Sequence, residues 1–245
     1  MLETYVKKIL SSKVYDLAKE TPLSPARLLT QRFGTQVYLK REDLQSIFSF
    51  KLRGAYNRMV HIDANQLEKG VVTASAGNHA QGVAVAADKL NVKATVVMGF
   101  NTPAIKVESV KNFGAKVILH GDSYDEAAEF ANNLAESEGS TYIHPYDDPL
   151  VIAGQGTVGM EIANQHTGHI DAIFVPVGGG GLIAGIACFF KYLRPQTKII
   201  GVEAEGSACL FEAKKSGRRV KLPRESLVLF ADGVSVAQIG DEPFK

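Results

Sequence analysis

The sequence predicts an α/β protein in which helices flank parallel sheets. Short runs rich in β-branched and aliphatic residues alternate with longer helical patterns, as expected of repeated strand–helix units. Two consecutive segments, VVTASAGNHAQGVAVAADKLNV and ATVVMGFNTPAIKVESVKNFGA, share this layout. The uncharged run from Ala172 to Phe190 contains Pro176 and four consecutive glycines in its middle, so it predicts a strand, a turn and a helix rather than a membrane span.

The elements follow in order along the chain. The predicted strands are Val37–Lys40, Val71–Ala74, Ala94–Met98, Lys116–Leu119, Ala172–Val177 and Lys198–Glu203. The helical patterns between them include Asn78–Leu90, Ala104–Phe113 and Tyr124–Glu138. The last of these helices follows Asp122 and Ser123, which are suited to cap its start, and precedes Gly139, which is suited to end it.

We expect two lobes. A small lobe at 67–143 is inserted into a large lobe that residues 1–66 and 144–245 form together. The turn-rich segment HPYDDP, at His144–Pro149, marks the crossing between the lobes.

Composition excludes several classes of function. The chain has 245 residues, 22% of them charged, with a formal net charge of +1 and no basic stripe, so no nucleic-acid partner is expected. Cys188 and Cys209 are not in metal-ligand spacing, and His166 with His169 are best explained as a solvated helix end, so no metal is expected. The N-terminus lacks an apolar signal region, and we expect a cytoplasmic protein without a membrane partner.

The stretch SFKLRGA places Lys51 between Phe50 and Leu52 at the expected start of a helix. Such neighbours can remove water from an amine, which lowers its pKa and leaves it neutral, as imine formation requires. The alternative is a solvated lysine at a helix N-terminus, and Lys51 considered alone favours that alternative.

A second motif, VPVGGGGLIAG, contains four consecutive glycines after a strand. Backbone N–H groups in such a turn can converge on an anion at the start of a helix. The motif fits a phosphate cup for pyridoxal phosphate, but Gly179, Gly181 and Ala184 also satisfy a dinucleotide-binding pattern, with Glu203 near the position of a ribose-binding acid. A tight turn without a ligand is the third interpretation, and four glycines in a row argue against it.

A third motif, TASAGNHAQG, lies at another expected strand-to-helix junction. Ser75, Gly77 and Asn78 offer hydroxyl, backbone and amide groups to a carboxylate or a ring oxygen, although a simple helix cap explains each of them equally well. The stretch IAGQGT, Ile152–Thr157, is interpreted as a fourth loop of the same kind with a weaker signal.

Taken in order, SFKLRGA, SAGNHAQG, IAGQGT and VGGGGL resemble the fold type II pyridoxal-phosphate enzymes, and among them the threonine dehydratases. The resemblance extends from Ser12 to the end of the chain, and VEAEGSACL and LFADGVSVAQIGDEPF are most similar to the biosynthetic type. It implies a tryptophan synthase β-like fold of two lobes, each with a mainly parallel sheet flanked by helices. It also implies a homo-oligomer with an amino acid as its small-molecule partner.

The resemblance also implies roles for particular residues. Lys51 would bind the aldehyde of pyridoxal 5'-phosphate as a Schiff base and later take the Cα proton, and Phe50 would lie against the cofactor ring. Asn78 would hydrogen-bond the ring hydroxyl. Ser75, Ala76 and Gly77 would hold the substrate carboxylate, while the phosphate would be held by Gly178, Gly179, Gly180, Gly181 and Leu182.

The implied reaction is the β-elimination of L-threonine to 2-oxobutanoate and ammonia, which begins isoleucine biosynthesis, with L-serine as a further substrate. Leu52 stands where synthases of this fold carry an acid, and Ala76 stands where racemases carry a second serine base, so elimination is favoured. The family pattern continues past Lys245 with a serine for the ring nitrogen and a regulatory domain. We therefore expect a C-terminally truncated catalytic domain, and the alternatives are a nicotinamide-binding Rossmann protein or a catalytically incompetent fragment.

Overall fold

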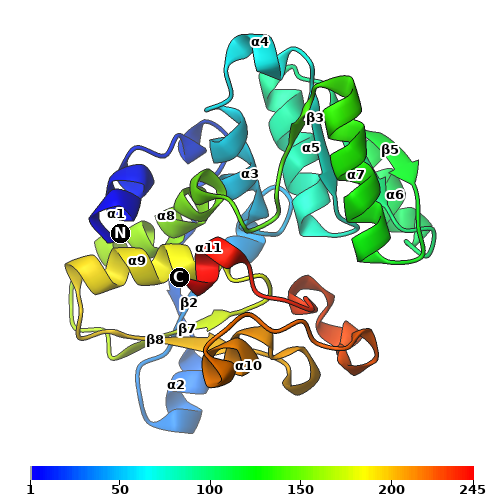
Figure 1. Ribbon diagram of the computed structural model, residues 1–245. Coiled ribbons are helices and arrows are strands. Elements are labelled where there is room, and N and C mark those ends of the chain that lie inside the picture. The colour runs from blue at the N-terminus through cyan, green and yellow to red at the C-terminus, as the bar shows by residue number, and fades with distance from the viewer. Residues whose placement is uncertain (1) are drawn as a thin grey trace.

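The computed structural model describes residues 2–245 and shows an α/β architecture (Figure 1). The strands are β1 (Leu23–Pro25), β2 (Tyr38–Lys40), β3 (Val71–Ala74), β4 (Ala94–Met98), β5 (Lys116–Leu119), β6 (Thr141–Tyr142), β7 (Ala172–Pro176) and β8 (Lys198–Val202). The helices are α1 (Leu2–Leu10), α2 (Arg27–Phe33), α3 (Lys51–Met59), α4 (Ala64–Leu67), α5 (Asn78–Leu90), α6 (Ala104–Lys111), α7 (Tyr124–Glu138), α8 (Pro149–Gln165), α9 (Gly181–Leu193), α10 (Cys209–Ser216) and α11 (Asp241–Phe244).

Short 3₁₀ segments complete the chain and connect the larger elements. They are η1 (Val14–Asp16), η2 (Glu42–Leu44), η3 (Glu205–Ser207), η4 (Arg224–Ser226) and η5 (Leu229–Val234). Of these, η2 bears directly on the site, because it lies between β2 and the start of α3.

A four-stranded parallel sheet has the order β5-β4-β3-β6, and all of its strands fall within residues 71–142. Successive residues of β3 face opposite layers. Val71 packs in a core shared with α3, α5 and α6, whereas Val72 packs in a core shared with α7. Helices therefore cover both faces, as parallel strands require. The division into lobes at 67–143 stays a prediction.

A second parallel pair, β7 with β8, lies beside α9, while β1 and β2 form a short antiparallel pair. The main core of this part joins α1, α8 and α9, and includes Ile9, Ile186 and Phe190. Figure 1 shows the N-terminal helix α1 against α8 and α9, to the lower left of the four-stranded sheet in this view.

Most predicted elements are confirmed within one or two residues. The strand predicted from Val37 is β2, which begins one residue later, at Tyr38. The strands β7 and β8 each end one residue earlier than predicted. The helix predicted at Ala104–Phe113 ends at Lys111. Ser123, rather than Asp122, caps α7, because its side chain accepts a hydrogen bond from the N–H of Glu126.

The predicted loop at Ile152–Thr157 is wrong, because these residues lie inside helix α8. Their glycines permit close helix packing rather than a turn. A Cβ at Gly154 would stand 2.7 Å from the carbonyl oxygen of Arg53 in α3, and a Cβ at Gly185 in α9 would stand 2.6 Å from the nitrogen of Gly156. Tertiary contact with two neighbouring helices thus overrides the low helix propensity of glycine.

Candidate functional site

Lys51 is the first residue of α3, as the sequence predicted, and its side chain is partly buried. Its Nζ donates a hydrogen bond to the carbonyl oxygen of Pro145 at 3.0 Å and lies 5.7 Å from the centre of the Phe50 ring. The backbone is held closely as well. A Cβ at Gly82 of α5 would stand 3.1 Å from the carbonyl carbon of Lys51.

Burial lowers the pKa of Lys51 from its ordinary value of 10.5 to about 8. Desolvation is the sole cause of the shift, and among residues 2–245 no counter-charge offsets it. A larger share of the side chain is therefore present as the neutral amine near pH 7, which is the form that attacks a carbonyl carbon.

The glycine motif forms the turn between β7 and α9. Gly180 has φ +93°, a conformation that favours glycine, and α9 begins at the next residue. Within residues 2–245, the backbone N–H groups from Gly178 to Leu182 donate to no protein acceptor. This arrangement leaves several N–H groups at a helix N-terminus available to an anion.

The crossing segment brings the lysine and the glycine turn together. Pro145 accepts the hydrogen bond from Lys51, and the next residue, Tyr146, packs on the turn. A Cβ at Gly179 would overlap the Tyr146 ring, and a Cβ at Gly181 would stand 3.0 Å from the Tyr146 carbonyl oxygen. The sequence reasoning missed Pro145 and Tyr146 as site residues, although the turn-rich HPYDDP signal marked the segment.

The loop after β3 lies at the start of α5, as predicted. Ser75 Oγ accepts a hydrogen bond from the N–H of Gly77 at 3.2 Å, so Ser75 partly serves as a local turn residue. Asn78 is the first residue of α5 and is exposed. Its neighbour His79 is buried and donates from Nε2 to the carbonyl oxygen of Ile143 at 3.0 Å.

His79 is neutral in this position. Burial, followed by the nearby Lys51, lowers the pKa of His79 from 6.5 to about 3. Its Nδ1 is buried and has no hydrogen-bond partner within the described part of the chain. His79 thus adds no charge near Lys51 at neutral pH.

Glu203, the candidate ribose-binding acid, uses both of its carboxylate oxygens in hydrogen bonds within the protein. Its two carboxylate oxygens accept hydrogen bonds from the N–H groups of Leu210 and Phe211, each at 2.9 Å. The side chain therefore caps the start of α10. The local geometry therefore assigns Glu203 to helix capping. The dinucleotide interpretation of the glycine turn then lacks the carboxylate that would bind the ribose.

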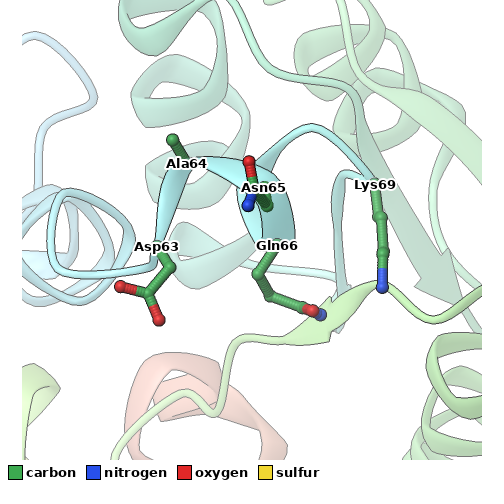
Figure 2. Close-up of a pocket in the computed structure, with 5 residues that line it drawn as sticks. All are labelled: Asp63, Ala64, Asn65, Gln66 and Lys69. Carbon is green, nitrogen blue, oxygen red and sulfur yellow. The ribbon is translucent and has the colours of Figure 1, made fainter.

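Other features do not add to the site. A hollow of about 550 Å³ lies on α4 and is lined by Asp63, Ala64, Asn65, Gln66 and Lys69, and none of the predicted site residues borders it (Figure 2). Across residues 2–245 no group of three or more metal-ligating side chains is present. In the same range, no helix is both long enough and apolar enough to cross a membrane.

The residues present fit pyridoxal phosphate. The unpaired N–H groups of Gly178–Leu182 can donate hydrogen bonds to its phosphate. The partly buried amine of Lys51 can attack the carbon of its aldehyde. The Tyr146 backbone and ring border the glycine turn, and the preceding Pro145 contacts Lys51. The individual roles predicted for Phe50, Ser75–Gly77 and Asn78 stay predictions.

Comparison with known proteins supports this fit. The family described as pyridoxal-phosphate dependent enzyme matches residues 14–245. The chain is 55% identical to a threonine dehydratase of Nicotiana attenuata over 98% of its own length and 40% of that protein. It is 53% identical to a biosynthetic L-threonine dehydratase of Burkholderia multivorans, of which it covers 48%. The chain thus spans less than half the length of these curated relatives.

Solved structures agree with this result. The processed form of threonine deaminase isoform 2 from Solanum lycopersicum superimposes with a TM-score of 0.95 and 53% identity, over 99% of this chain and 70% of that one. Maize serine racemase superimposes with a TM-score of 0.91 and 33% identity, over 99% of this chain and 72% of that one. The predicted fold type is confirmed, and the nicotinamide-binding alternative is not favoured. The chain belongs to the family of pyridoxal-phosphate dependent enzymes.

Proposed function

We propose that this chain carries the catalytic centre for the β-elimination of L-threonine to 2-oxobutanoate and ammonia, with L-serine as a second substrate. The observation that carries the proposal is the placement of Lys51. Its partly buried amine contacts Pro145, and the adjoining Tyr146 packs on a glycine turn that has unpaired N–H groups. The similarity to threonine dehydratases supports threonine as the substrate.

Lys51 has two tasks in this proposal. Pyridoxal phosphate, when bound, supplies a carbonyl carbon for an amine to attack and a ring that accepts the electron pair released at Cα. Lys51 would hold the cofactor through Nζ. The free Nζ would accept the Cα proton, which suits an amine whose pKa burial has lowered to about 8. The β-hydroxyl would leave as water with one proton, equivalent to the one removed from Cα, and hydrolysis of the resulting imine would take up one water, so threonine gives 2-oxobutanoate and ammonia with no net change in water.

The surrounding residues bind and orient. The N–H groups of Gly178–Leu182 hold the phosphate, which anchors the cofactor at the start of α9. The turn Ser75–Gly77 holds the substrate carboxylate, and the exposed Asn78 amide bonds the ring hydroxyl. Phe50 lies beside Lys51 and excludes water from one face of the ring.

Borohydride reduction followed by peptide mapping tests the proposal. In the chain incubated with pyridoxal 5'-phosphate, we expect the label on Lys51 and release of 2-oxobutanoate from threonine. Lys51→Ala should abolish both, while Lys89→Ala, which removes an exposed lysine of α5, should change neither. Label on another lysine would contradict the assignment of Lys51. Label on Lys51 without release of any 2-oxo acid would favour a chain that binds the cofactor without turnover.

We also propose a homo-oligomer and a cytoplasmic location. Exposed apolar side chains on and beside α2, including Leu28 and Phe33, suit contact with another subunit. The two cysteines are free, which is consistent with a reducing compartment. Related plant proteins are named chloroplastic, so cell fractionation in the source organism decides the compartment. Sedimentation of the purified chain decides the oligomeric state.

A further inference from the structure

Arg53 lies two residues after Lys51 in α3, and its side chain is fully buried. Its guanidinium donates from Nε and Nη2 to the two carboxylate oxygens of Glu42, each at 2.8 Å. On its other side it donates from Nη1 and Nη2 to the two oxygens of Glu161. A further hydrogen bond runs to the hydroxyl of Thr157 at 3.0 Å. Two carboxylates thus share one buried guanidinium.

The charges of this cluster balance. Lys40 lies 2.5 Å from Glu161, and its side chain is also buried, so Arg53 and Lys40 neutralise Glu42 and Glu161. Tyr15 adds a neutral hydrogen bond to Glu161 at 2.9 Å. The partners come from β2, η2, α8 and η1, so the cluster attaches α3 to several elements of the structure. Paired and hydrogen-bonded in this way, the buried charges have a defined geometry.

The position of Arg53 on α3 matters for Lys51. Residues two apart on a helix point about 200° from each other, so Arg53 and Lys51 leave α3 on opposite sides. Arg53 contacts α8 and η2, while Lys51 contacts Pro145. A Cβ at Gly154 of α8 would stand 2.7 Å from the carbonyl oxygen of Arg53. Figure 1 shows α3 between α5 and α8.

We propose that Arg53 is a positioning residue: its bonds to Glu42 and Glu161 fix the rotation of α3 about its own axis and thereby hold the Lys51 amine at the Pro145 carbonyl, facing the glycine turn. This inference rests on the proposed role of Lys51. The bidentate fork is essential to it, because a lysine at position 53 would keep the charge but not the two planar pairs of hydrogen bonds. The cluster has no contact with substrate or cofactor in this proposal and acts through the helix.

The groups around Lys51 allow the pKa of its amine to be used as a measure of how α3 is rotated. His79 of α5 and His144 of the crossing segment are the titratable side chains coupled to it, and burial lowers the pKa of both. Both are therefore neutral at and above pH 7, where the lysine titrates. A change in the Lys51 pKa then reports the solvation of its amine, which depends on how α3 is rotated.

The test compares variants by competitive acetylation of Lys51 with acetic anhydride across pH, read by mass spectrometry on the full chain without cofactor. The principal variant combines Arg53→Met with Glu161→Gln. It removes the ion pair between α3 and α8, and the remaining charges of Lys40 and Glu42 still sum to zero. Arg53→Lys is the conservative variant. Arg58→Met is the matched control, since it removes a different ion pair of α3, the one to Asp148 just before α8, at 3.0 Å.

We expect the paired variant to raise the Lys51 pKa by at least about one unit, which lowers the neutral amine at pH 7 about tenfold. The rate at which added pyridoxal 5'-phosphate attaches should fall by a similar factor, and the circular dichroism of the attached cofactor should weaken. Arg53→Lys should give an intermediate shift, and Arg58→Met should match the unaltered chain.

An unchanged Lys51 pKa in a folded paired variant would overturn the proposal. If the paired variant fails to fold, Arg53→Lys is used instead. An unchanged Lys51 pKa in Arg53→Lys would overturn the proposal as well. A shift of the same size in Arg58→Met would also overturn it, since any loss of α3–α8 contact would then suffice. The proposed function has its own test: it fails if borohydride leaves no label on Lys51 of the unaltered chain. The acetylation data do not depend on that label, so the two failures can be told apart.

Discussion

The Lys51 Nζ and the Pro145 carbonyl oxygen lie 3.0 Å apart, although the two residues are separated by 94 positions in the chain. The contact joins the start of α3 to the segment that crosses between β6 and α8. A carbonyl oxygen accepts a hydrogen bond from a neutral amine as well as from an ammonium group. Pro145 therefore holds Lys51 in place in either protonation state, and the lowered pKa of the side chain shows that the loss of solvation outweighs this one hydrogen bond.

Cofactor attachment should follow the titration of Lys51. With a pKa of about 8, roughly one amine in ten is neutral at pH 7, so the rate of attachment should rise about tenfold by about pH 9.5 and then level off. Stopped-flow absorbance with pyridoxal 5'-phosphate between pH 6 and 10 measures this dependence. A rate that still rises steeply at pH 10 would show an ordinary, solvated lysine instead.

Lys51→Met should stabilise the chain at neutral pH. The pKa of Lys51 is lowered on folding, so the unfolded state binds more protons between about pH 8 and 10.5, and stability of the unaltered chain rises with pH in that window. Below pH 8 the full cost of burying the charge is present. We expect Lys51→Met to raise the free energy of unfolding at pH 7 by roughly 1–3 kcal/mol.

Urea unfolding of both proteins at pH 7 and pH 10 checks this expectation. The advantage of the variant should shrink at the higher pH, because the lysine is then largely neutral in the folded state and begins to lose its proton in the unfolded state. Equal differences at the two pH values would contradict a desolvated lysine. Lys89→Met, at an exposed site, should show no such dependence.

Gly180→Ala should disturb the glycine turn that we propose holds the phosphate. Gly180 has φ +93°, and an added Cβ would stand 2.5 Å from Ile239 Cδ1, so we expect a loss of about 1–3 kcal/mol in stability and weaker retention of the cofactor. Gly233→Ala is the control, since nothing lies within 4 Å of its Cβ and its φ is not positive. Thermal unfolding and cofactor dialysis measure the two effects. Equal behaviour of the two variants would argue against a specific requirement at Gly180.

Glu203→Ala should lower stability by about 0.5–2 kcal/mol, because two N–H groups at the start of α10 lose their acceptor. Cofactor attachment at Lys51 should be unaffected. Glu203→Gln should retain part of the cap through its side-chain oxygen. Fluorescence titration with NADH should detect binding in none of the three proteins, whereas saturable binding that disappears in Glu203→Ala would revive the dinucleotide interpretation.

The sequence predicted the helices and strands well where the pattern is local. β3, β4, β5, α5 and α7 have the predicted bounds, since alternation of apolar residues, Ser123 and Gly139 define them within a few positions. It was wrong at Ile152–Thr157, where glycines that normally signal a turn lie within α8. Their conformation depends on contacts with α3 and α9, which no local pattern contains.

By itself, the sequence determined the fold class and the family, and it identified the amine and the glycine turn that the proposed function uses. Only the tertiary structure decided which groups surround Lys51. Pro145 and Tyr146 reach the site, Glu203 caps a helix, and Arg53 pairs with Glu42 and Glu161. The physical reason is distance along the chain. Helix periodicity and turn chemistry act between near neighbours, whereas desolvation and buried ion pairs arise when segments far apart pack together.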